Sequence, residues 1–163
     1  MAVSPEEFKA CLGCRVSGVA IVTSCDGEHV HGMTVSDFTS VSLDPPLVVV
    51  SLSETANTLE VIRAGKCFAV NVLSTDQVDL SNVFASEERE DTRFEGLSWS
   101  KAVTGAPLIP GSKVILDCTV VAMHVAGDHV LCIGQVEHLE IHDVEPLVYY
   151  QGGYRDLRGT EAL

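Results

Sequence analysis

Short stretches rich in hydroxyl side chains lie at the ends of two strand-like segments and at the start of the helix-like segment that follows. These residues are Thr34, Val35, Ser36 and Asp37, then Ser51, Leu52 and Ser53, and finally Asn57 and Thr58. A helix start offers unpaired backbone N–H groups and the positive end of the helix dipole, which suit a phosphate. Ordinary capping of the helix by Ser53 or Thr55 explains the same pattern, so both interpretations stay open.

Two arginines, Arg89 and Arg93, stand in the otherwise acidic segment S-E-E-R-E-D-T-R-F at 86–94. The whole chain has 10 Lys and Arg against 23 Asp and Glu, a formal net charge of −13. An anionic ligand is therefore repelled by the chain as a whole and needs cations within a screening length of about 10 Å. The two arginines can supply them. The alternative is a solvated loop whose local ion pairs contribute little.

His129 follows the turn sequence Gly127-Asp128 between two long β-rich segments. A histidine at such a hairpin tip is either solvated or reaches over a neighbouring pocket as a hydrogen-bond donor. The phosphate-binding patterns G-x-G-x-x-G and the P-loop are both absent from the sequence. Any phosphate site must therefore be built from side chains and a helix start rather than from a glycine-rich loop.

The sequence contains six cysteines. They are Cys11, Cys14, Cys25, Cys67, Cys118 and Cys132. Cys11 and Cys14 form a lone C-x-x-C near the end of the first predicted helix; zinc would need a second close pair of ligands, and a thioredoxin-type site would open a helix. We therefore expect no metal site and two small residues on a buried helix face. The other four are expected to be small buried hydrophobes without disulfides.

Length and composition limit the class of protein. The chain has 163 residues, 46% of them hydrophobic, which suits one domain with a substantial core. The net negative charge argues against binding to nucleic acid or to an anionic membrane surface, because both require a basic face. The first residues, M-A-V-S-P-E-E, lack the basic and apolar regions of a signal peptide, so we expect a cytoplasmic protein.

The pattern of elements predicts a mainly β protein. Helices are expected to begin at Pro5, with Ser4 as its cap, at Thr55, with Gly65 as its stop, and at Thr75. Strands are expected at 16–24, 28–35, 38–43, 47–52, 67–73, 113–125, 129–141 and 147–150. Many short strands joined by hairpins favour a closed or nearly closed antiparallel barrel with helices packed outside. The tail from Arg158 is expected to fray.

Seven sequence blocks resemble, in order, those of the short-chain flavin reductases, the reductase components of two-component flavin-dependent monooxygenases. The blocks are G-V-A-I-V-T (18–23), H-G-M-T-V-S-D-F (31–38), S-V-S-L-D-P-P-L (40–47), F-A-V-N-V-L (68–73), C-T-V (118–120), A-G-D-H-V-L-C-I-G-Q-V (126–136) and P-L-V-Y-Y (146–150). The resemblance covers roughly residues 8–156, nearly the whole chain. It implies one domain with an FMN-binding split β-barrel of Greek-key-like antiparallel strands, usually as a homodimer with the flavin near the subunit interface.

The resemblance also implies an activity and a set of roles. The activity is hydride transfer from NADH or NADPH to FMN or FAD, with reduced flavin passed to a partner monooxygenase. Thr34, Val35, Ser36 and Asp37 would line the isoalloxazine ring, Ser51, Leu52 and Ser53 would flank it, and Asn57 and Thr58 would hold the phosphate. Phe84, Ala85, Arg89 and Arg93 would close over the ribityl phosphate or adenine, His129 would contact the nicotinamide, and Tyr154 and Arg155 would lie near the site.

One position departs from the family pattern. Many relatives carry a second serine where this chain has Asp37. A carboxylate beside the flavin phosphate would be repulsive, so either Asp37 faces another way or the phosphate lies elsewhere. Two alternative functions use the same fold: a non-catalytic flavin carrier or sensor, and an oxidase-like protein that binds haem or flavin.

Overall fold

The computed structural model describes residues 3–27, 29–36 and 38–158 of the chain. The two interpretations of Asp37, and the fraying expected from Arg158 as far as it concerns 159–163, fall on positions outside these residues. The helices are α1 (Pro5–Gly13), α2 (Asn57–Gly65) and α3 (Val78–Ala85), with the short 3-10 turns η1 (Thr75–Gln77) and η2 (Glu90–Thr92). The strands are β1 (Ser17–Gly18), β2 (Ala20–Cys25), β3 (Val30–Val35), β4 (Phe38–Leu43), β5 (Pro46–Ser53), β6 (Cys67–Val72), β7 (Val114–Ala126), β8 (His129–Ile141), β9 (Val148–Tyr150) and β10 (Gly153–Arg155).

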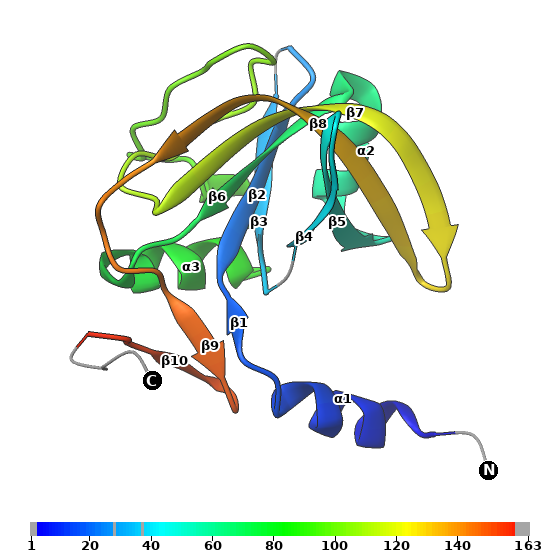
Figure 1. The fold of residues 1–163 in the computed structure, drawn as a ribbon, viewed down its shortest axis with the longest axis vertical. Coiled ribbons are helices and arrows are strands. Elements are labelled where there is room, and N and C mark those ends of the chain that lie inside the picture. Colours follow the sequence, from blue (N-terminus) through cyan, green and yellow to red (C-terminus); the bar gives the residue numbers. More distant parts are fainter. Residues whose placement is uncertain (1–2, 28, 37, 159–163) are drawn as a thin grey trace.

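Seven strands form one antiparallel sheet in the order β3-β2-β6-β7-β8-β5-β4 (Figure 1). The order begins with β3 and ends with β4, although these two strands are consecutive in the chain. The sheet therefore curls round so that its two edge strands meet at a split. The predicted mainly β fold with antiparallel, barrel-like strands is confirmed.

The interior of the curled sheet is a single apolar cluster. Strands from both halves of the sheet contribute to it, including Val22 of β2, Val50 of β5 and Phe68 of β6. Burying each such side chain stabilises the fold by about 1.5–3 kcal/mol. The packing leaves no room for a side chain at Gly134 of β8, because a Cβ there would lie 2.5 Å from the Phe68 ring.

Helix α2 covers one open end of this interior with Leu59 and Ile62, which are fully buried in the same cluster. The predicted stop at Gly65 is the last helical residue, and Lys66 after it adopts the left-handed conformation with φ 56°. Gly65 is required for a different reason: a Cβ on it would come within 1.7 Å of the backbone oxygen of Cys25. The glycine lets the end of α2 lie directly against β2.

Helix α3 packs beside β3 and carries the fully buried Phe84, which shares a second apolar cluster with Ile21 and Leu147. The helix predicted from Thr75 is confirmed, with its first residues forming the 3-10 turn η1. The segment predicted as one strand at 16–24 is split. β1 pairs with β9 in a small three-stranded sheet with β10, whereas β2 joins the large sheet.

The prediction for α1 is wrong in one respect. Its capping by Ser4 is confirmed, because Ser4 Oγ accepts from Glu7 N at 3.2 Å while Glu7 Oε2 accepts from Ser4 N at 2.9 Å. However, α1 buries no residue and stands apart from the sheet (Figure 1). Cys11 and Cys14 are exposed, and the apolar Phe8 on the same helix is 58% exposed. The spacing of Phe8, Cys11 and Leu12 places them on one face, but the described part of this chain offers that face no surface to cover it.

Candidate functional site

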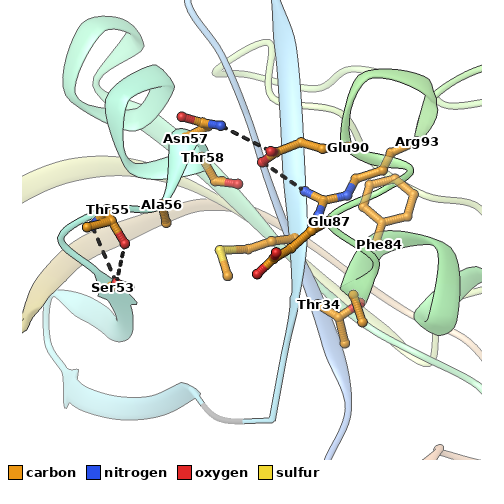
Figure 2. A pocket seen from close by; sticks show the side chains of 12 residues that line it. Thr34, Ser53, Thr55, Ala56, Asn57, Thr58, Phe84, Glu87, Glu90 and Arg93 are labelled. Atoms are coloured by element: carbon orange, nitrogen blue, oxygen red, sulfur yellow. Dashed lines mark hydrogen bonds and ion pairs between the residues drawn. The ribbon is translucent and has the colours of Figure 1, made fainter.

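A cavity of about 480 Å³ lies at the split of the sheet (Figure 2). Its wall comes from β3, the end of β5, the start of α2, the end of α3 and the loop after α3. The lining residues are Met33, Thr34, Ser53, Thr55, Ala56, Asn57, Thr58, Phe84, Ala85, Glu87, Glu90 and Arg93. Its volume is in the range of pockets that bury a ligand of cofactor size.

The start of α2 lines this cavity, and no side chain caps it. The N-cap residue is Ala56, which has no side-chain oxygen to accept from the first turn. Ser53 instead uses its hydroxyl within the preceding turn, 3.0 Å from Thr55 Oγ1 and 3.3 Å from the Thr55 backbone nitrogen. The interpretation that Ser53 or Thr55 caps the helix is therefore wrong. The N–H groups of Asn57 and Thr58 are left for a ligand, whereas that of Leu59 donates to the Ala56 oxygen at 2.9 Å.

Polar side chains from three segments meet around one carboxylate on the cavity wall. Asn57 Nδ2 donates to Glu90 Oε2 at 3.1 Å, and Arg93 Nη1 lies 3.5 Å from Glu90 Oε1. His31 on β3 lies 3.4 Å from Glu90 Oε1 through its Nε2, and 2.8 Å from Thr58 Oγ1 through its Nδ1. Burial is the main cause that lowers the pKa of His31, opposed by the charge of Glu90.

Arg93 is held by backbone as well as by charge. Its Nη1 donates to the Gly32 oxygen at 2.8 Å and its Nη2 to the Ser86 oxygen at 3.0 Å. The side chain is only 6% exposed, and its Nε is buried without a partner. Burial lowers the pKa of the guanidinium, while Glu90 and Glu87 raise it, and an arginine stays charged in this range. The site therefore contains a fixed cation with one unused donor.

A second cavity of about 270 Å³ adjoins the first, because Thr34 and Ala85 line both. Its other lining residues are Val19, Val35, Ser36, Ser81, Tyr149 and Tyr154. Tyr154 donates to Asn82 Oδ1 at 3.0 Å and lies 2.9 Å from Ser81 Oγ, while Thr34 Oγ1 donates to the Ser81 oxygen at 2.7 Å. These bonds tie β3 and β10 to α3 and hold the shape of this part of the groove.

Ten of the predicted site residues that the structure describes are brought together by the two cavities. They are Thr34, Val35, Ser36, Ser53, Asn57, Thr58, Phe84, Ala85, Arg93 and Tyr154. Two important residues, His31 and Glu90, were not among the predictions. The alternation of β3 offered a weak signal for His31, but nothing local marks Glu90 among five neighbouring acidic residues.

The remaining predicted residues lie elsewhere. Leu52 is buried in the barrel interior, and Ser51 is exposed on the opposite face of β5, because successive side chains of a strand alternate. Arg89 borders separate hollows with Val83, outside the main cavity. Arg155 is exposed and donates to its neighbour's backbone oxygen at 2.8 Å.

His129 lines neither cavity, but it neighbours a residue that lines the main one. It is the cross-strand partner of Ser53, at the point where β5 ends. Its Nδ1 lies 2.7 Å from Asp128 Oδ1, and the side chain is 45% exposed. Through its pairing with Ser53 it stands at the rim of the main cavity.

Two further searches concern only the residues that the structure describes. No three His, Cys, Asp or Glu side chains among them are grouped to hold a metal ion. None of their helices is long and apolar enough to span a membrane.

The chain matches known proteins along most of its length. A family model described as the flavin reductase like domain matches residues 12–158. An NADH-dependent flavin reductase from a Rhodococcus species is 45% identical over 158 residues, which cover 95% of this chain and 88% of that protein. The reductase subunit HsaB of a flavin-dependent monooxygenase from Mycobacterium tuberculosis is 35% identical over 155 residues, covering 93% and 82%. The solved flavin reductase PheA2 in its native state superposes with a TM-score of 0.87 at 37% identity, covering 95% of this chain and 99% of that chain.

Proposed function

The chain belongs to the flavin reductase family whose domain spans residues 12–158, and from this premise we propose that it is an NAD(P)H-dependent flavin reductase. It takes FMN or FAD and a nicotinamide nucleotide, and it supplies reduced flavin to a partner monooxygenase. The observation that carries the proposal is the cavity at the sheet split, where an anion-binding helix start and a buried arginine meet an adjoining groove.

The residues of this site fit a flavin. Its phosphate would be held by Asn57, Thr58 and the first N–H groups of α2, with Arg93 as the fixed cation. The unpartnered Nε of Arg93 supports this assignment, because a buried donor without an acceptor is costly unless a ligand supplies one. The ring would lie along Thr34 and the adjoining groove.

The protein's own contribution is binding and orientation. Flavin and nicotinamide supply the hydride chemistry when both are bound. Thr34 and Tyr154 fix the groove through their bonds to α3, so the ligand meets a preformed wall. Asp128 orients the His129 ring through Nδ1 and leaves Nε2 for contact with the nicotinamide. No nucleophile is required of the protein.

Four further features belong to the proposal. The chain forms a homodimer, which is supported by the apolar face of α1, where Phe8 and Leu12 are exposed on a helix that has no buried residue in the described part of the chain. The partner that receives the flavin is a monooxygenase, as the name of the Mycobacterium relative indicates for that protein. The domain is single, and its location is cytoplasmic.

The test is the rate of NADH and NADPH oxidation with FMN and with FAD, measured as a matrix of four pairs. The proposal expects turnover with at least one pair and transfer of reduced flavin to an added monooxygenase. Flavin binding without turnover would instead indicate a carrier or sensor. A Soret absorption band from the purified protein would indicate haem.

A further inference from the structure

Asn57 and Arg93, which are proposed above to form the cradle for the flavin phosphate, already contact one anion, the carboxylate of Glu90 (Figure 2). One of its oxygens accepts from Asn57 Nδ2 at 3.1 Å. The other lies 3.5 Å from Arg93 Nη1 and 3.4 Å from His31 Nε2. These contacts come from α2, from the loop after α3 and from β3. Glu90 thus occupies the place where three separate segments present side-chain nitrogen atoms.

We propose, on the basis of the flavin site described above, that Glu90 is an internal anion which the flavin phosphate must displace. The Asn57 hydrogen that Glu90 accepts cannot also be donated to the phosphate, and two anions beside Asn57 and Arg93 would repel each other. Glu90 then sets how strongly a phosphorylated flavin is held and discriminates against it relative to an uncharged one. It is a specificity-determining residue rather than a catalytic one.

The Glu90 side chain can move away from Asn57 and Arg93 without displacing these two residues. Its side chain is 29% exposed and begins the 3-10 turn η2, so solvent is open to it. Arg93 is anchored independently by the backbone oxygens of Gly32 and Ser86. Asn57 is fixed by its place in the first turn of α2. Rotation of one carboxylate therefore exposes a cradle whose other members stay in position.

The consequence for the proposed reaction concerns release. An enzyme that delivers reduced flavin to another protein must let the flavin go, and a competing carboxylate inside the chain speeds that departure. Glu90 returns to Asn57 and Arg93 as the phosphate leaves, so these polar groups are not left unsatisfied. The same carboxylate weakens binding and makes the empty site stable.

The test compares FMN with riboflavin, which has the same ring system but no phosphate. Dissociation constants are measured by flavin fluorescence for the wild type, Glu90→Gln and Glu88→Gln. Glu90→Gln removes the charge but keeps the shape, and should tighten FMN binding by about tenfold or more, because it removes a like charge close to the phosphate. Riboflavin binding should change by less than about twofold, since it carries no charge to repel.

Glu88→Gln is the matched control. Glu88 is exposed, lines no described cavity and carries the same charge two residues away, so its loss should change either dissociation constant by less than about twofold. Glu90→Ala is the second variant, and the melting temperature of each variant confirms folding. An unchanged or weaker FMN affinity in both Glu90 variants overturns the inference.

The wild-type results separate this inference from the proposed function. If the wild type oxidises NADH with FMN but the ratio of FMN to riboflavin affinity is the same in Glu90→Gln, the inference alone fails. If the wild type neither binds flavin nor oxidises NADH, the proposed function fails and the inference falls with it.

Discussion

Ser53 at the end of β5 and His129 at the start of β8 are direct cross-strand partners, which places a cavity residue and the rim histidine side by side. The pairing follows from the long β7–β8 hairpin, whose second strand runs along β5 from Gln135 to His129. A residue at the tip of this hairpin is therefore held beside the main cavity by backbone hydrogen bonds rather than by its own side chain.

His129→Ala should raise the KM for NADH about tenfold while kcat changes by less than about threefold, because the role proposed for the histidine is to position the nicotinamide without transferring a proton. Steady-state kinetics at saturating flavin measure both constants. His124→Ala is the control, since His124 lies on β7 of the same hairpin, is exposed and lines no described cavity. An unchanged KM in His129→Ala would refute the role.

Acidification should destabilise the protein through His31. Burial lowers the pKa of His31 in the folded chain, so below the ordinary value of about 6.5 the unfolded chain binds a proton that the folded chain does not. Stability from this group is therefore complete above about pH 6.5 and is lost as the pH falls below it. When the pH is lowered from 7.5 to 5.5, the urea concentration at the midpoint of unfolding should decrease for the wild type. It should decrease less for His31→Gln.

The exposed His29 provides the comparison for that experiment. His29→Gln should keep the wild-type loss of stability with acid, because the side chain of His29 is 76% exposed in a turn. If His31→Gln loses as much stability as the wild type over the same range, His31 is not the group responsible.

Gly65→Ala should destabilise the fold by about 3 kcal/mol or more, because the new methyl group would overlap the backbone oxygen of Cys25, which cannot move without shifting β2. Gly13→Ala provides the matched control at the end of α1, where a Cβ meets nothing within 4 Å. It should change stability by less than about 0.5 kcal/mol. Chemical denaturation of both variants measures the difference, and equal effects would contradict the close packing of α2 on β2.

The four strand cysteines should resist thiol reagents in the folded protein. Burial raises the pKa of Cys118 to about 12 and that of Cys132 to about 11, and Cys25 shifts in the same direction for the same main reason. A Cys11→Ala/Cys14→Ala double variant should show no fast-reacting thiol at pH 8 and four thiols after denaturation. Rapid labelling of the folded variant would show that the barrel opens.

Much of the fold follows from local patterns in the sequence, and the exceptions have physical causes. The hairpin at 126–128 and the helix before Gly65 carry turn and stop signals that do not depend on distant residues. The split of 16–24 into β1 and β2 depends on β9, which lies far along the chain and pairs with only the first part. The short strand β10 lacks any periodic signal because it has three residues.

The same distinction applies to the site. Thr58 and Asn57 could be predicted because a helix start is a local feature with a known affinity for phosphate. His31 and Glu90 could not, since their role arises from contact between segments far apart in sequence. The exposure of α1 could not be predicted from local sequence either. The spacing of apolar residues shows which face of a helix is apolar, but not whether another part of the chain packs against that face.

The strand order gives ligand binding a consequence for folding cooperativity. β3 and β5 both line the cavity, yet β2, β6, β7 and β8 stand between them in the sheet. A bound molecule contacts both β3 and β5, and these strands are brought together only when the four strands between them are all paired. A form in which any of these pairings is broken therefore cannot hold the molecule. Ligand binding in this cavity should then slow hydrogen exchange of the most protected amides throughout the sheet. Retention of flavin would indicate that all strand pairings of the barrel are intact.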